Sequence, residues 1–197
     1  MNKHLFQPFD YTYDVSKGCK IVNVFFPQDC GNNCPFCTTK SWYKDTNINK
    51  WWQSLIKVMS SEPDIVIITG GEPLSNRQLL EEAVFLIRKL GKENLELYIN
   101  TSPTEEMMDY RLFSFINKNF NGLNFSAHNI SRTDALLRSF IDCLEIPIRI
   151  NYVLPENVDL LLIEDIITHF FNYVEMIKDA EKVFQSLREK KHLVPLK

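Results

Sequence analysis

The chain has 197 residues, of which 45% are hydrophobic and 24% are charged, and its formal net charge at pH 7 is −3. This length and composition suit one domain with a buried core. We expect a single domain over residues 1–197, with its core at about residues 20–173 and a helical C-terminal segment at about residues 174–191. A negative charge without a dense basic run argues against a nucleic-acid backbone as the partner.

No segment has the pattern of a membrane-spanning or exported protein. The apolar run at residues 160–171 is too short for a membrane span and contains Glu164 and Asp165. The N-terminal residues lack the apolar core of a signal peptide. We therefore expect a cytoplasmic protein that does not interact with membranes, in a compartment where free thiols persist.

The first predicted strand, residues 20–26, leads into a loop with three cysteines. Cys30, Cys34 and Cys37 lie in the sequence DCGNNCPFCT, with the spacing CxxxCxxC. Three thiolates this close in sequence can hold three corners of a cubic iron–sulfur cluster, and no fourth cysteine follows in the loop. A cluster with one iron that the protein does not bind can bind and reduce a small molecule there, whereas clusters that only carry electrons normally have four protein ligands.

Two other kinds of site fit the loop less well. A structural zinc site needs a fourth ligand, and no histidine lies near the loop in sequence. A disulfide framework is a poor fit because the chain has five cysteines, an odd number. The loop alone favours an iron–sulfur cluster and leaves zinc and unliganded thiols open.

The next elements are a helix and a buried strand. Residues 48–59 carry apolar side chains at helical spacing, with Asn47 or Asn49 as the N-cap. The β-branched run at residues 65–68 predicts a buried strand that leads into the turn Gly-Gly-Glu-Pro at residues 70–73. The two glycines let the backbone approach a ligand, and the glutamate adds a carboxylate. By itself such a turn is also typical of an ordinary strand-to-helix connection.

Strands and helices alternate along the rest of the chain. Strands are predicted at residues 95–99, 123–128 and 147–154. Helices are predicted at residues 76–90 with Gly91 as C-cap, from residues 102–105 onward, at 134–143 and at 159–173. Strands separated by helices imply βαβ units and a parallel sheet, with the site at the C-terminal ends of the strands. The sequence therefore predicts an α/β fold.

The CxxxCxxC loop after a first strand, followed by Gly-Gly-Glu-Pro after a second, resembles the radical S-adenosylmethionine superfamily. The later strands resemble that fold more weakly, and the likeness covers about residues 20–170. The resemblance implies an incomplete parallel (βα) barrel of the radical S-adenosylmethionine type, with about five to six βα units. It implies an oxidoreductase-like enzyme that cleaves S-adenosylmethionine reductively to a 5′-deoxyadenosyl radical, and this radical abstracts hydrogen from a substrate.

The same resemblance implies the residues that bind the two cofactors. The ligands of a 4Fe–4S cluster would be Cys30, Cys34 and Cys37, and the fourth iron would bind the amino and carboxylate groups of S-adenosylmethionine. The turn that would hold the ammonium of this cofactor consists of Gly70, Gly71, Glu72 and Pro73. The resemblance singles out no catalytic residue.

Further residues are weaker candidates for binding S-adenosylmethionine. Phe36 would pack near the adenine, although plain core packing is equally open. Ser126 and Asn151 are candidates for the ribose and the methionine carboxylate, and Thr101 is a weaker one. Arg149 alternates with Asn151 along one strand, so both side chains are predicted to face the same side. The partner of a buried arginine would be a ligand carboxylate or a protein acid.

The C-terminal part departs from the superfamily pattern. Five strands are convincing, residues 159–191 have the pattern of nearly continuous helix, and Pro195 allows residues 192–197 to form an edge strand at best. A minimal core, a truncated core and a core completed by a partner remain open. The alternative function is therefore a non-catalytic zinc-binding, iron–sulfur or interaction protein on a degenerate core.

As an enzyme, the chain would need two kinds of partner. The first is a reductant such as flavodoxin or ferredoxin. The second is a substrate, for which a peptide, a nucleotide-like metabolite and a glycyl-radical partner enzyme all remain open.

Overall fold

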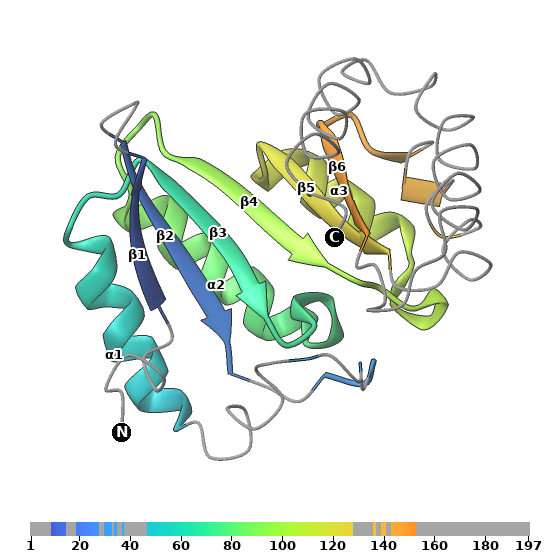
Figure 1. The fold of residues 1–197 in the computed structure, drawn as a ribbon, viewed down its shortest axis with the longest axis horizontal. Coiled ribbons are helices and arrows are strands. Elements are labelled where there is room, and N and C mark those ends of the chain that lie inside the picture. Colours follow the sequence, from blue (N-terminus) through green and yellow to red (C-terminus); the bar gives the residue numbers. More distant parts are fainter. Residues whose placement is uncertain are drawn as a thin grey trace, which may run out of the picture.

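The computed structural model describes the chain at residues 9–14, 19–27, 30–32, 34, 37, 47–127, 136, 139–140 and 143–152. Within these residues, six strands form one sheet in which the order of the strands follows the chain (Figure 1). The strands are β1 (Phe9–Asp14), β2 (Cys19–Phe26), β3 (Ile65–Gly70), β4 (Glu96–Thr101), β5 (Gly122–Ala127) and β6 (Ile148–Tyr152). Strands β2 to β6 pair with one another in the parallel direction, which confirms the predicted α/β fold with a parallel sheet.

The sequence did not predict β1. This strand pairs with β2 in the antiparallel direction, from Phe9 opposite Val24 to Asp14 opposite Cys19. Among the described strands, β1 and β6 lie at the two ends of the sheet and do not pair with each other. The described strands therefore form a partial parallel βα fold without a closed ring.

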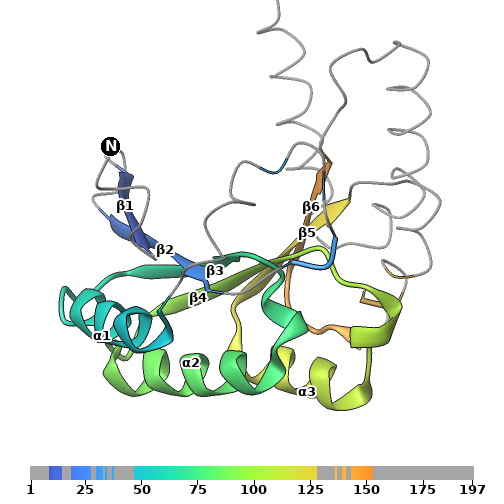
Figure 2. The same ribbon diagram turned by 90° about the horizontal axis from the view of Figure 1, so that it is seen from below.

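Helices cover one face of the sheet. The α-helices of the described part are α1 (Ile48–Met59), α2 (Arg77–Leu90) and α3 (Tyr110–Asn119), and the short 3-10 turns are η2 (Pro73–Ser75) and η3 (Glu105–Met107). Figure 2 shows all three α-helices on the same side of the sheet. Among the described helices, none has the length and apolar character needed to cross a membrane.

Alternation along the strands separates the two faces of the sheet. Val22, Val24 and Phe26 of β2 are fully buried, whereas the residues between them are partly exposed. Successive side chains of a strand point to opposite faces, so the buried set packs against the helices. The core continues with Val66, Ile68, Leu97, Ile99, Leu123 and Phe125 of the sheet and with Leu55, Leu80, Ile87, Leu112 and Ile116 of the helices. We call the face opposite α1, α2 and α3 the inner face.

The predicted boundaries are confirmed for α1, whereas α2 begins one residue later than predicted, at Arg77, and ends at Leu90 as expected. The Asn47 Oδ1 atom accepts a hydrogen bond from the Lys50 N–H at 3.1 Å, and Asn76 Oδ1 accepts one from the Leu79 N–H at 3.1 Å. Each asparagine satisfies an N–H group that the first turn of a helix leaves without a partner. Gly91 is the C-cap of α2, as expected.

The helix expected from residues 102–105 begins later than predicted. Only the short turn η3 forms there, and Thr104 makes no side-chain capping bond. Helix α3 begins at Tyr110, where Asp109 Oδ1 accepts a hydrogen bond from the Leu112 N–H at 2.6 Å. A carboxylate also interacts favourably with the positive end of the helix dipole, so Asp109 sets the start of the helix.

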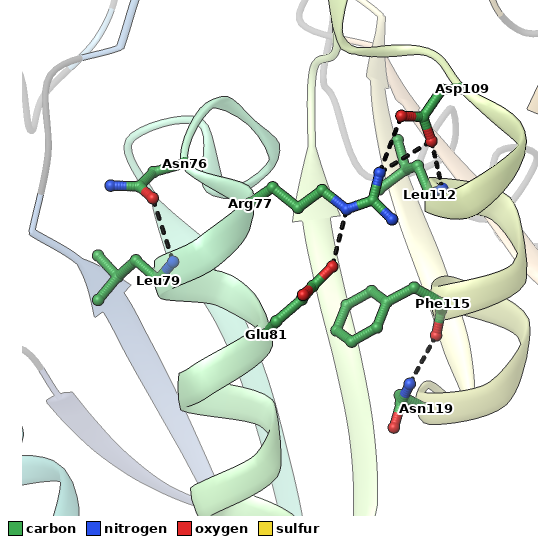
Figure 3. A network of polar contacts seen from close by, with 8 residues as sticks. All are labelled: Asn76, Arg77, Leu79, Glu81, Asp109, Leu112, Phe115 and Asn119. Carbon is green, nitrogen blue, oxygen red and sulfur yellow. Dashed lines mark hydrogen bonds and ion pairs between the residues drawn. The ribbon is translucent and has the colours of Figure 1, made fainter.

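Arg77 joins the first turns of α2 and α3 (Figure 3). Its Nε atom lies 2.8 Å from Glu81 Oε1, and its Nη1 atom lies 2.8 and 3.0 Å from the two oxygens of Asp109. The Asp109 carboxylate is therefore both a helix cap and an ion-pair partner. Because α2 and α3 begin where β3 and β4 have ended, this network joins the starts of the two helices beside the C-terminal edge of the sheet.

Several predicted elements lie wholly or partly outside the described residues. The helix expected at residues 134–143 is described, as helix, only at residues 136, 139–140 and 143. The helices expected at residues 159–173 and 174–191 and the edge strand at residues 192–197 lie outside the described part.

Candidate functional site

The cysteine loop follows β2 at the C-terminal edge of the sheet. The end of β2 is held by Trp51 of α1, whose Nε1 atom donates to the carbonyl of Phe25 at 2.8 Å. Cys30, Cys34 and Cys37 are partly exposed thiols that form no disulfide. The Cys37 N–H donates to the Cys34 carbonyl at 3.2 Å, so the last two cysteines lie on one turn. Phe36 lies outside the described residues.

The donor set fits an iron–sulfur cluster. Soft thiolate ligands are those that iron–sulfur clusters take. Burial raises the pKa of the Cys30 thiol, and the charges of Glu72, Cys34 and Cys37 raise it further, whereas a hydrogen bond from the Asn32 N–H lowers it. The thiols therefore repel one another as thiolates, and a bound cationic group would relieve this repulsion.

The three thiols are not gathered around a single point. In the part of the chain that the structure describes, no three side chains of His, Cys, Asp or Glu are arranged to hold one metal ion. A zinc site needs its sulfur ligands at about 2.3 Å from one centre, whereas a cubic cluster distributes its thiolates over different irons. Cys30, Cys34 and Cys37 therefore remain predicted cluster ligands.

The Gly-Gly-Glu-Pro turn begins beside the end of β2. Gly70, the last residue of β3, is in register with Phe26, and Gly71 is partly exposed. Pro73 is buried in the turn η2, which Glu72 caps by accepting a hydrogen bond from the Leu74 N–H at 3.0 Å. The fold thus brings the turn and the cysteine loop to neighbouring positions on one edge of the sheet.

We expect Gly70→Ala to lower the free energy of unfolding by about 2–4 kcal/mol. Gly70 has a φ of +107°, and a Cβ atom there would lie 2.5 Å from the backbone nitrogen of Phe26. Both the backbone conformation and the contact oppose a side chain. Urea unfolding measures the change, with Gly31→Ala in the cysteine loop as the control, because a Cβ atom there meets nothing within 4 Å. Equal losses in the two variants would contradict this expectation.

Glu72 is almost completely buried, with 1% of its surface exposed. Its Oε1 atom accepts a hydrogen bond from the Thr101 hydroxyl at 2.5 Å, and its Oε2 atom accepts one from the Ser102 N–H at 2.6 Å. Burial raises the pKa of Glu72, against the opposing effect of these hydrogen bonds. The carboxylate thus joins the end of β3 to the end of β4, a role that the sequence did not predict.

The structure places Thr101 in this contact and away from the inner face. The side chain is 2% exposed, and its hydroxyl donates to Glu72. The contact accounts for the hydroxyl without a cofactor, so a direct role in binding S-adenosylmethionine remains only a prediction.

Ser126 and Asn151 are brought together on the inner face. They are register partners on β5 and β6, with Ser126 partly exposed and Asn151 exposed. Arg149, two residues before Asn151, is also exposed. It is the register partner of Asn124, two residues before Ser126, so Arg149 and Asn151 lie on the same face of the sheet, as predicted. The structure places these candidates side by side without testing what they bind.

A row of polar side chains crosses the inner face, and most of this row was not predicted from the sequence. The Asn124 Nδ2 atom donates to Asn100 Oδ1 at 2.5 Å, and Asn100 Nδ2 donates to Thr69 Oγ1 at 3.1 Å. Arg149 stands beside Asn124 in the sheet and extends the row to β6. The signal was the alternation of a polar residue with apolar ones inside otherwise buried strands. We call Thr69, Asn100, Asn124 and Arg149 the polar row.

Comparison with known proteins agrees with this geometry. Residues 16–126, more than half of the chain, match the family model described as a 4Fe-4S single cluster domain. Over 86 residues the chain is 34% identical to 7-carboxy-7-deazaguanine synthase of Hyperthermus butylicus, a segment that is 43% of this chain and 33% of that protein. The match therefore spans about a third of the length of that relative. The chain belongs to the 4Fe-4S single cluster domain family, which is associated with radical S-adenosylmethionine proteins.

Proposed function

We propose that the protein is a radical S-adenosylmethionine enzyme that holds a 4Fe–4S cluster through Cys30, Cys34 and Cys37. The observation that carries the proposal is the meeting of the three-cysteine loop and the Gly-Gly-Glu-Pro turn at one edge of a parallel sheet. When bound, the reduced cluster supplies the electron that splits S-adenosylmethionine into methionine and a 5′-deoxyadenosyl radical, which takes a hydrogen atom from the substrate. The protein positions the cofactors and the substrate and excludes water from the site.

The residues at the C-terminal edge of the sheet and on its inner face have distinct roles in this proposal. The backbone of Gly70 and Gly71 offers carbonyl acceptors to the ammonium of S-adenosylmethionine, and the buried carboxylate of Glu72 fixes their turn. On the inner face, Ser126 and Asn151 offer hydrogen bonds to the ribose and the methionine carboxylate. Phe36 is proposed to pack on the adenine.

A nucleobase-like metabolite is the substrate class that we favour over a peptide or a glycyl-radical partner. The name of the relative, 7-carboxy-7-deazaguanine synthase, supports this choice for the matched third of that protein. The polar row supports it independently, because side-chain amides both donate and accept hydrogen bonds, and a guanidinium binds an anionic group. Flavodoxin or ferredoxin is the proposed reductant, in a cytoplasmic setting where thiols stay reduced.

Anaerobic reconstitution tests the proposal. The full chain is loaded with iron and sulfide and then mixed with dithionite and S-adenosylmethionine, and 5′-deoxyadenosine is quantified by mass spectrometry. We expect the nucleoside only when both dithionite and cluster are present, and an equal yield from Cys143→Ala, which leaves the cysteine loop intact.

The alternative function predicts a different result. A chain that binds iron and sulfide but forms no 5′-deoxyadenosine would be a non-catalytic iron–sulfur protein. A chain that stays colourless and binds zinc would contradict the proposal altogether.

A further inference from the structure

Asn32 lies between the first two cysteines of the loop and reaches the sheet. Its Nδ2 atom donates to the carbonyl oxygen of Ser102 at 2.5 Å, across 70 positions of sequence. Ser102 directly follows β4, so the contact ties the cysteine loop, which follows β2, to the end of a strand two places away in the sheet. The side chain is partly buried, which protects the bond from competition by water.

Ser102 is itself held by the Gly-Gly-Glu-Pro turn. The residue whose carbonyl accepts the bond from Asn32 also donates its N–H to Glu72 Oε2 at 2.6 Å. The neighbouring Thr101 hydroxyl donates to the other oxygen of the same carboxylate. Hydrogen bonds to a charged, buried acceptor are stronger than those between neutral groups. Two consecutive bonds therefore connect the cysteine loop to the buried carboxylate of Glu72. We call Asn32, Ser102 and Glu72 the loop latch.

We propose that Asn32 is a positioning residue, which holds the cysteine loop on the end of β4 through the loop latch and so keeps the three thiols beside the Gly-Gly-Glu-Pro turn. The proposal rests on the proposed function only in taking these thiols to be the cluster ligands. A neutral amide suits the position, because it donates to a carbonyl without adding charge next to three thiolates. An aspartate would remove the donor and add a negative charge at the same place.

Three substitutions separate these effects. Asn32→Ala removes the donor, Asn32→Asp also adds charge, and Asn32→Gln keeps an amide. The control is Asn117→Ala, near the end of α3 and away from the loop. The Asn117 Nδ2 atom also donates to a backbone carbonyl, that of Cys143 at 3.0 Å, and its Oδ1 atom accepts from the Glu145 N–H at 2.8 Å, so this variant removes at least as much hydrogen bonding as Asn32→Ala. Urea unfolding of all four variants reports the overall stability.

Two readouts follow the loop itself. The first is the rate of iron release from the reconstituted full chain to a chelator, with the electron paramagnetic resonance spectrum of the reduced cluster. The second is the rate of alkylation of Cys30, Cys34 and Cys37 by iodoacetamide in the metal-free full chain, with the partly exposed Cys19 at the start of β2 as internal reference. Losing one such hydrogen bond should accelerate both processes about fivefold in Asn32→Ala. In Asn32→Asp we expect a larger acceleration of iron release, and a smaller acceleration of alkylation than in Asn32→Ala, because the added negative charge disfavours the thiolates that react with iodoacetamide. Rates should stay within about twofold of wild type in Asn32→Gln and Asn117→Ala.

Each outcome decides the proposal. Wild-type rates in Asn32→Ala would overturn it, and so would an equal acceleration in Asn117→Ala, which would indicate a loss of overall stability. Neither readout requires cleavage of S-adenosylmethionine, so a chain that keeps its cluster without making 5′-deoxyadenosine still tests the loop latch. If the wild type takes up no cluster, the proposed function fails, and the alkylation rates alone decide the role of Asn32.

Discussion

Cys34→Ala should abolish binding of the cluster and, with it, cleavage of S-adenosylmethionine. With two of three thiolates left, the iron content after reconstitution should fall from about four atoms per chain to less than about one. Formation of 5′-deoxyadenosine should fall by more than the factor of about 10–100 that changes outside the ligand shell of a metal typically cost. Iron and sulfide analysis, visible absorbance and the nucleoside assay measure the three losses.

Cys19→Ala is the matched control for this variant. Cys19 begins β2, at the opposite end of that strand from the loop, and is a partly exposed thiol like Cys34. We expect the control to keep both iron and activity. Retention of a full cluster in Cys34→Ala would show that the loop is not the ligand set, and equal losses in the two variants would indicate damage to the fold.

Glu72→Gln should lower the free energy of unfolding by about 2–4 kcal/mol. Both carboxylate oxygens accept hydrogen bonds, from the Leu74 N–H and the Thr101 hydroxyl on one side and from the Ser102 N–H on the other. The amide replaces one oxygen by an NH₂ group, so in either orientation a donor faces a donor in a buried place. Urea unfolding and the iron-release rate should both reveal the change.

Two further variants control this prediction. Glu81→Gln removes an exposed carboxylate that pairs with Arg77 at 2.8 Å, and surface ion pairs contribute only about 0–1 kcal/mol. Thr101→Val removes one donor and leaves the carboxylate in place, so it should cost about 1–2 kcal/mol even if Glu72→Gln fails to fold. The assignment of Glu72 as the anchor would be wrong if Glu72→Gln were as stable as Glu81→Gln.

The elements that the sequence predicted are those with a strong local pattern. Helix α1 spans Ile48–Met59 as expected, because its apolar residues repeat at helical spacing behind an asparagine cap. The buried run of β3 and the Gly-Gly-Glu-Pro turn were recognisable for the same reason. Strand β1 was missed because its evidence is its antiparallel pairing with β2, a tertiary contact that local pattern does not encode.

The site was predictable in its residues and much less so in its contacts. The cysteine spacing and the turn identified which residues meet, whereas the bond from Asn32 to Ser102 spans 70 positions and leaves no sequence motif. Thr101 and Asn100 are neighbours in sequence, but the alternation of β4 sends one side chain to Glu72 and the other into the polar row. Of these two adjacent polar residues, only Asn100 therefore has its side chain on the inner face.

The strands lie in the sheet in the order in which they are synthesised. Asn32, Glu72 and Ser102 all precede β5 and β6, so the loop latch depends on nothing encoded after Ser102, the residue that directly follows β4. Pairing between strands that are consecutive in the chain also keeps the loops to be closed short, and such contacts form early. A nascent chain therefore contains all three members of the loop latch before β5 and β6 have been synthesised.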